Sequence, residues 1–216
     1  MMLPKLLDFV FPRICVGCGD WGFDLCPDCF NKIKVYRKKN IFPKPFNGVT
    51  AIFEYSGIIE KIIKEIKFQF FYDKYAELIE LALACLGEDK DFTQNFDSKM
   101  ILVPVPLHPV RLRWRGFNQS ELLGKCLAKK LRIKIAPRLL QRIKNTQAQS
   151  LLKKEDRQEN IEGAFIINPN FPRSIIHNSC FILFDDIWTT GATMIECAKV
   201  LKKNNAKFIW GITLAG

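Results

Sequence analysis

The sequence predicts an α/β fold in which helices cover both faces of a central parallel sheet. Two observations favour this fold. Apolar runs of strand length alternate with segments whose apolar residues recur at helical spacing, and 216 residues suit one medium domain with a small module. A basic, proline-containing stretch at residues 37–45 precedes this alternation. We therefore expect a small cysteine-rich module in residues 1–40 and an α/β domain in residues 46–216.

The elements of the α/β domain follow in chain order. Apolar residues at helical spacing predict helices at residues 58–66, 78–86, 122–131 and 194–201. The second of these helices is expected to begin near Asp73 and to stop at Gly87. Short apolar runs predict strands at residues 100–105, 181–184 and 208–214. Because ligands of such sheets bind beyond the carboxyl ends of the strands, the loops after residues 105 and 184 should carry the chemistry.

The composition excludes several classes of protein. Hydrophobic residues make up 48% of the chain and charged residues 25%, the balance of a folded globular protein rather than a disordered or fibrous one. No stretch approaches the roughly 18 consecutive apolar residues that a membrane span needs. The apolar N-terminus carries Asp8 and lacks the cleavage site of a signal peptide. We expect a cytoplasmic protein without a membrane span.

The net charge of +11 is concentrated in one stretch of the chain. Residues 105–145 hold eleven basic side chains and one acidic side chain. A concentrated positive field favours polyanionic ligands such as nucleic acid, phosphate or pyrophosphate. The alternative is a solvated basic face that keeps the protein soluble.

Four of the eight cysteines form two C-x-x-C pairs separated by seven residues, namely Cys15, Cys18, Cys26 and Cys29. Two such pairs supply four thiolates, the closed tetrahedral shell of a structural Zn²⁺ site. A redox dithiol is the alternative, but two adjacent copies without a thioredoxin-like context argue against it. We therefore expect one structural zinc ion, which stabilises a segment too small to bury a core of its own.

An acidic pair and a hydroxyl-rich turn follow the apolar run at residues 181–184. The pair is Asp185 and Asp186, and the turn consists of Thr189, Thr190, Gly191, Ala192 and Thr193. Backbone N–H groups at a helix start can hold a phosphate, whereas carboxylates suit vicinal hydroxyls or Mg²⁺. The segment thus has the parts to hold a ribose 5-phosphate. The alternative is an acidic strand end followed by an ordinary N-cap threonine.

Three arginines alternate after the strand at residues 100–105. Arg111, Arg113 and Arg115 are expected to lie in a loop that ends at Gly116 and to bind one anion, for which pyrophosphate is suited. DNA phosphates are the competing ligand, because aromatic side chains interleaved with basic ones suit single-stranded DNA. The residues of that interpretation are Trp114, Phe117, Lys129, Lys130 and Arg132.

Residues 181–193 resemble the phosphoribosyl pyrophosphate (PRPP) motif of type I phosphoribosyltransferases. The whole chain resembles the ComF (ComFC) branch, which joins an N-terminal four-cysteine zinc module to a transferase domain. The resemblance rests on residues 103–106 and 113–119, on Tyr55, Gly57, Lys67 and Phe68, and on Thr146, Gln149, Arg157, Asn160, Gly163 and Phe165.

This resemblance implies a type I phosphoribosyltransferase fold with a hood and a site for PRPP and Mg²⁺. It implies Asp185 and Asp186 at the ribose hydroxyls, residues 189–193 at the 5-phosphate, and the loop of residues 111–116 at the pyrophosphate. Lys67 would reach the ligand from the hood, and Ala192 stands where the motif often has a second glycine.

The implied function is the handling of incoming single-stranded DNA in natural transformation, with PRPP as a ligand and a competence helicase or DNA-processing proteins as partners. The alternative is an active Mg²⁺-dependent phosphoribosyltransferase with an unidentified acceptor. The sequence identifies no general base for such an acceptor.

Overall fold

The computed structural model describes residues 13–36, 44–67, 76–146 and 156–216. Its centre is a five-stranded sheet in the order β1–β7–β6–β2–β3, and every pair of neighbouring strands is parallel. The strands are β1 (Gly48–Phe53), β2 (Ile101–Pro104), β3 (Lys134–Ile135), β6 (Cys180–Ile187) and β7 (Phe208–Ala215). This confirms the expected α/β class with a central parallel sheet.

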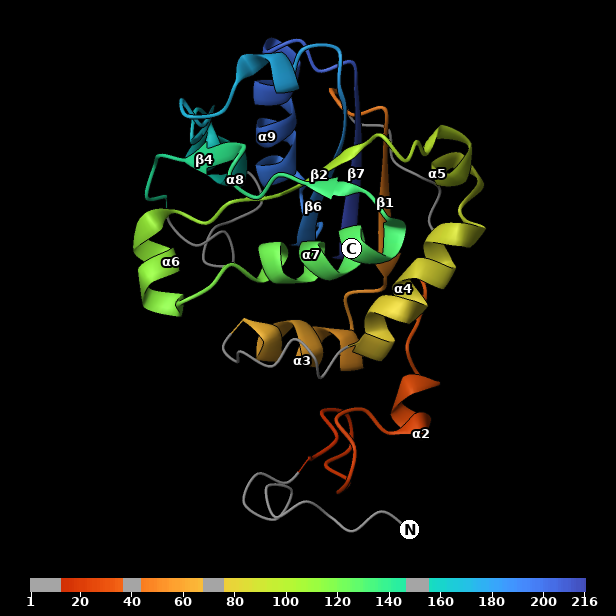
Figure 1. Cartoon of the computed structure of the whole chain (residues 1–216). Helices are drawn as coiled ribbons and strands as arrows, with labels where there is room; N and C mark the ends of the chain where they lie inside the picture. The colour runs from red at the N-terminus through yellow and green to blue at the C-terminus, as the bar shows by residue number, and fades with distance from the viewer. Residues whose placement is uncertain (1–12, 37–43, 68–75, 147–155) are drawn as a thin grey trace.

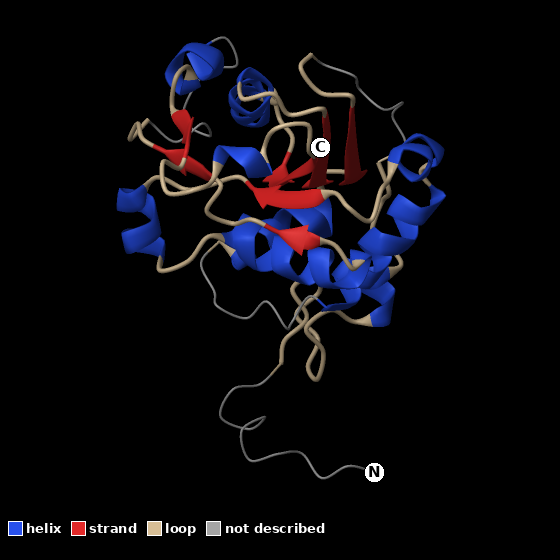
Figure 2. Cartoon of the chain, turned by 45° about the horizontal axis from the view of Figure 1, so that its top comes forward, coloured by secondary structure: helices blue, strands red, loops and turns tan. Residues whose placement is uncertain are grey.

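Helices cover both faces of the sheet (Figure 1, Figure 2). One face carries α3 (Gly57–Ile66), α4 (Ala76–Glu88) and α7 (Gln119–Leu131), and the other carries α9 (Ala192–Lys203). Beside α9 lie α8 (Asp156–Ile161) and a two-stranded antiparallel sheet made of β4 (Leu140–Arg142) and β5 (Phe165–Ile167). The remaining described helices are α2 (Pro27–Phe30), α5 (Lys90–Asn95), α6 (Pro109–Arg115) and the short 3₁₀ turn Arg173–Ile175.

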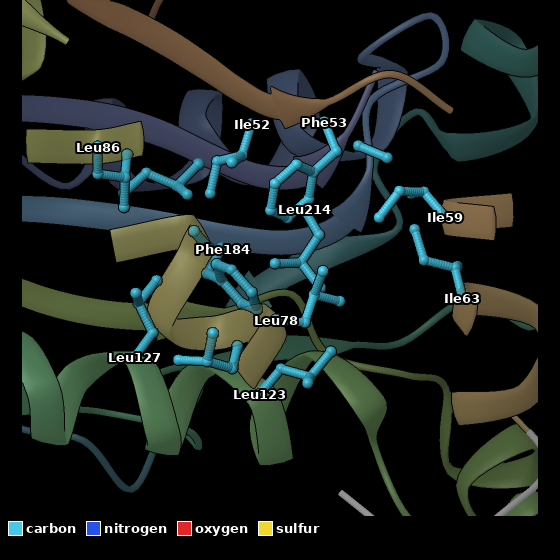
Figure 3. Close-up of a cluster of buried hydrophobic side chains, with 14 of the residues drawn as sticks. Ile52, Phe53, Ile59, Ile63, Leu78, Leu86, Leu123, Leu127, Phe184 and Leu214 are labelled. Carbon is cyan, nitrogen blue, oxygen red and sulfur yellow. The ribbon is translucent and has the colours of Figure 1, made fainter. Parts of the chain in front are cut away.

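The apolar run of β6 packs against both helix layers. Ile182 and Phe184 belong to the core cluster under α3, α4 and α7, whereas Phe181 and Leu183 belong to the cluster under α9. Figure 3 shows Phe184 of the sheet among leucines of α4 and α7. Side chains of a strand alternate between faces, so a strand buried on both faces must be apolar at every position.

Several element boundaries differ from those that the sequence predicts. Strand β6 runs on through the acidic pair to Ile187, and α9 begins at Ala192 rather than near Met194. Helix α4 passes Gly87 and ends at Glu88, while the expected start near Asp73 lies outside the described residues. The parallel ladder to β7 continues to Ile187, which explains the longer strand.

The cysteine-bearing segment packs against the end of the sheet domain near α3 (Figure 1). Lys61 of α3 donates a hydrogen bond of 2.9 Å from Nζ to the carbonyl oxygen of Gly17. Val35 forms an antiparallel bridge with Phe53 of β1. The boundary between residues 1–40 and 46–216 remains a prediction. Among the described residues, no helix is long and apolar enough to cross a membrane.

Candidate functional site

Asp185 and Asp186 lie at the carboxyl end of β6, which is the central strand of the sheet. Adjacent strand residues project to opposite faces, so the two carboxylates meet different neighbours. Asp185 accepts hydrogen bonds at Oδ1 from Ser120 Oγ (2.7 Å) and from the Asp186 backbone N–H (3.0 Å). Asp186 Oδ2 lies 3.0 Å from Lys67 Nζ and accepts a hydrogen bond of 3.4 Å from Gln119 Nε2. Residues of α7 and Lys67, the C-cap residue of α3, thus fix the pair in place.

Burial raises the pKa of Asp185 to about 7, and the charge of Asp186 adds to this rise. The hydrogen bonds from Ser120 and the Asp186 N–H and the charge of Lys67 oppose it less strongly. A neighbouring carboxylate disfavours the charged form of an acid, so Asp186 acts on Asp185 in the same direction as burial. Asp185 therefore changes its protonation state near neutral pH.

The raised pKa of Asp185 should make the folded protein less stable as pH rises from about 4 to about 7. Over this window the folded state retains a proton that the unfolded state has lost, so deprotonation disfavours folding. We expect the free energy of unfolding, from urea titrations, to fall between pH 5 and pH 8 in the wild type. The fall should be smaller in Asp185→Asn. An identical pH slope in both proteins would show that Asp185 does not titrate in this range.

The hydroxyl-rich turn joins the end of β6 to the start of α9. Gly191 is the N-cap residue of α9 with φ +75°, and a Cβ there would lie 2.2 Å from the Trp188 ring. Only glycine fits this position, because both the backbone conformation and the ring exclude a side chain. The Ala192 N–H donates a hydrogen bond of 3.3 Å to Thr190 Oγ1. The predicted turn residues 189–193 thus lie at the same sheet edge as the acidic pair.

The segment of the three arginines is a helix and not the expected loop. Helix α6 spans Pro109–Arg115, and Gly116 ends it with φ +83°. His108 caps its N-terminus by accepting a hydrogen bond of 3.3 Å at Nδ1 from the Val110 N–H. Proline in the first helical turn and glycine after the last are helix signals that outweigh the alternating arginines.

The helical spacing divides the three arginines between two faces. Arg111 and Arg115 are four residues apart, so they share the face that turns inward and are half-buried, whereas Arg113 is exposed. Arg115 Nη1 donates a hydrogen bond of 2.6 Å to Gln119 Oε1, which links it through Gln119 to Asp186. Burial lowers the pKa of Arg115, while the charge of Asp186 raises it. The structure thus brings Arg111 and Arg115 toward the site and leaves Arg113 outside it.

Ser120, Gln119 and Arg142 also belong to this site, although the sequence did not identify their roles. Ser120 and Gln119 open α7 and hold one carboxylate each. The signal for Gln119 is its place at the end of residues 113–119, which carry part of the family resemblance. Arg142 is buried in β4. Burial, followed by the charge of Arg111, lowers its pKa to about 10, and the charge of Asp185 partly opposes this lowering.

The residues expected to bind single-stranded DNA do not form one continuous patch. The Trp114 side chain of α6 is 74% exposed. Phe117 is only 7% exposed, so its ring has no free face on which a base could stack. Phe117 lies in the turn between α6 and α7, and its assignment to DNA binding stays a prediction that its burial disfavours. Lys129, Lys130 and Arg132 are exposed at the far end of α7, about 18 Å along the helix from its first turn.

The four N-terminal cysteines come together as a metal site requires. Their sulfur atoms all lie within 4.8 Å of one another, and Cys18 Sγ and Cys26 Sγ are 3.6 Å apart. Zn–S bonds of about 2.3 Å at a tetrahedral ion place sulfur atoms about 3.8 Å apart. Burial, followed by the neighbouring thiols, raises the pKa of Cys29 to about 12. A bound cation would stabilise the deprotonated sulfur atoms, and the four sulfur atoms are close enough to share one, so the cluster fits a metal such as zinc.

Comparison with known proteins identifies the family, although no family model matches the chain. The chain is 29% identical to Competence protein F of Haemophilus influenzae over 216 residues, covering 94% of this chain and 90% of that protein. It is 27% identical to the DNA utilization protein YhgH of Escherichia coli over 164 residues, covering 76% and 70% of the two chains. It is 30% identical to Competence protein ComFC of Bacillus subtilis over 210 residues, covering 94% and 77%. With this identity along nearly its whole length, the chain belongs to the ComF family of competence proteins.

Proposed function

We propose that this chain is a PRPP-binding protein of natural transformation that handles incoming single-stranded DNA in the cytoplasm. The observation that carries the proposal is that an acidic pair ends the central strand β6 and a hydroxyl-rich turn follows it before α9, with Arg115 linked to Asp186 through Gln119. The names of the ComF relatives support a role in competence and DNA utilization. The proposal includes a type I phosphoribosyltransferase fold with a hood and a zinc module in residues 1–40.

In this proposal each end of PRPP meets residues of matching chemistry. Asp185 and Asp186 would accept hydrogen bonds from the ribose hydroxyls. They would also lie beside Mg²⁺, whose charge would neutralise the two adjacent carboxylates. The turn of residues 189–193 would hold the 5-phosphate at the N-terminus of α9. Arg111 and Arg115 would face the diphosphate as donors from one helix face.

Lys67 has two roles in the proposed site. Its ammonium group pairs with Asp186 at 3.0 Å, so a ribose hydroxyl or Mg²⁺ at Asp186 has to displace or share it. A lysine released from this pair remains beside the ligand, where its charge suits the phosphates of PRPP. Binding would thus exchange an internal ion pair for contacts with the ligand.

Calorimetric titration with PRPP tests the proposal. We expect one saturable site per chain in the presence of Mg²⁺ and weaker binding when EDTA replaces Mg²⁺, because the carboxylates then repel the ligand phosphates. Ribose 5-phosphate should bind less tightly than PRPP, since it lacks the diphosphate. No saturable heat with PRPP under either condition would refute the proposed ligand.

The DNA-handling part of the proposal makes its own prediction at Trp114. Stacking of a base on an exposed tryptophan contributes about 1–3 kcal/mol, so Trp114→Ala should weaken binding of a fluorescent oligothymidine about five- to a hundredfold. Anisotropy titrations at several salt concentrations should also show a steep loss of affinity with salt. Trp21→Ala is the matched control, because Trp21 is 72% exposed but lies in the cysteine segment. Equal DNA affinities for the wild type and Trp114→Ala would show that this side chain of α6 does not contribute to DNA binding.

The second candidate function is enzymatic transfer of the phosphoribosyl group to an acceptor. The observation that favours it is the inward face of α6, because half-buried arginines can stabilise the charge that develops on departing pyrophosphate. Measuring pyrophosphate release from PRPP in the presence of a panel of acceptors distinguishes an enzyme from a binding protein.

A further inference from the structure

Two neighbouring cavities lie at the β3 edge of the central sheet, which is the last strand in the sheet order. The larger has a volume of about 500 Å³ and is lined by residues of α6, α7 and β4. The smaller has a volume of about 260 Å³ and is lined by residues of β2, β3 and the 3₁₀ turn. Pro137 and Arg138 belong to both walls, and we call the two cavities together the edge groove. Among its described lining residues, none belongs to the acidic pair or to the turn of residues 189–193.

The walls of the edge groove are mainly apolar. Leu112 of α6 is 41% exposed and Ile143, which follows β4, is 50% exposed, and both line the larger cavity. Ile135 and Ile175 line the smaller one. Large apolar side chains that remain exposed around a cavity can be buried by the apolar groups of a ligand, which is a favourable exchange in water.

The charges of the edge groove are mostly positive. Arg138, which belongs to both walls, is exposed, and Lys134 lines the smaller cavity. Glu121 is the one acidic side chain among the described lining residues, and its carboxylate lies 2.7 Å from Lys125 Nζ. Basic side chains beside an apolar surface complement a ligand that combines apolar groups with carboxylates.

The chemistry of the walls favours a protein segment over nucleic acid. Bases need aromatic faces on which to stack. Phe171 is the one phenylalanine, tyrosine or tryptophan among the described lining residues, and it is only partly exposed because it packs against the core under α9. The exposed Trp114 lies about 200° around α6 from Leu112, so it faces away from the groove. Pockets with walls of leucine, isoleucine and proline suit aliphatic side chains.

We propose that the edge groove docks an extended, acidic segment of a partner protein. Two apolar side chains of this segment would fill the two cavities, and a carboxylate between them would meet Arg138 at the shared wall. Strand β3 pairs only with β2 among the described strands, so an extended chain can lie along its outer side. This docking surface goes beyond the proposed function, because PRPP binding uses other residues.

The test is fluorescence anisotropy with labelled synthetic peptides and the full chain. Each acidic probe has two leucines separated by one, two or three glutamates and flanked by further glutamates. We expect saturable binding of at least one of these peptides to the wild type. Replacing its leucines by serine, or its glutamates by lysine, should weaken binding about tenfold or more, because each change removes one of the two complementary features.

Variants of the groove locate the binding. Leu112→Glu should weaken binding of the acidic peptide about tenfold or more, since it places a charge in the larger cavity. Val110→Glu is the matched control, because Val110 is 43% exposed on the same helix but lines neither cavity, and it should bind like the wild type. Arg138→Glu should weaken the acidic peptide and strengthen the lysine peptide, with an unchanged affinity for PRPP. If circular dichroism shows that Leu112→Glu does not fold, Ile143→Glu replaces it with the same expectation.

The outcomes distinguish the docking surface from the proposed function. Peptide binding that depends on Leu112 and Arg138 supports the groove whether or not PRPP binds. Absence of saturable binding for every acidic leucine peptide, or an affinity unchanged in both Leu112→Glu and Arg138→Glu, would overturn it. Weaker binding of oligothymidine by Arg138→Glu, with no peptide bound by the wild type, would assign the groove to nucleic acid and also overturn it.

Discussion

Asp185→Asn combined with Asp186→Asn should abolish PRPP binding in a protein that still folds. Each carboxylate would supply charge-assisted hydrogen bonds worth about 1.5–3 kcal/mol, so losing both weakens binding roughly 100-fold or more. The amides keep the size of the side chains, and Ser120 and Gln119 can still hydrogen-bond to them. At pH 8 the loss of the buried charge of Asp185 should favour the folded state, and the loss of the ion pair between Asp186 and Lys67 should oppose this gain.

Calorimetry with PRPP and Mg²⁺, together with urea unfolding, measures both effects. Asp97→Asn is the matched control, because this aspartate accepts a hydrogen bond from the Lys99 N–H before β2 and so lies near the opposite edge of the sheet. It should bind PRPP like the wild type. A folded double variant with an affinity within threefold of the wild type would exclude the acidic pair from the binding site.

Loss of the metal should have the second large effect. We expect one zinc ion per chain in freshly purified, reduced protein, and Cys29→Ser should lose it. Three thiolates cannot complete a metal shell that requires four. The buried cysteines of the cluster also pack into the same core as α3. Unfolding of the cysteine segment therefore exposes apolar surface, and we expect the thermal midpoint to fall by several degrees or more.

Elemental analysis and thermal unfolding with and without EDTA measure this prediction. Cys126→Ser is the control, because Cys126 lies in α7 away from the four clustered sulfur atoms. It should keep its zinc. Metal-free wild-type protein, or a Cys29→Ser protein with full zinc content, would show that the cluster does not serve as a structural metal site.

The sequence predicts the elements whose signals are local and strong. The fully apolar run of residues 181–184 identifies a strand buried on both faces, and the paired C-x-x-C predicts four sulfur atoms close in space. Strand β6 is longer than its apolar run, because pairing with β7 carries the ladder past the carboxylates.

The contacts that assemble the proposed site cannot be predicted from local sequence patterns. Alternating arginines favour an extended loop, but Pro109 and Gly116 set a helix that turns Arg113 outward. Arg142 lies in a strand of three residues, whose burial depends on pairing with β5, more than 20 residues further along the chain. The ion pair between Lys67 and Asp186 joins residues more than 100 positions apart.

A crystal structure of the protein with PRPP and Mg²⁺ tests the central claim most directly. We expect the ribose hydroxyls and Mg²⁺ at Asp185 and Asp186, the 5-phosphate at the turn before α9, and the diphosphate toward Arg111 and Arg115. A ligand bound elsewhere, with Lys67 still paired to Asp186 and the turn unoccupied, would contradict it.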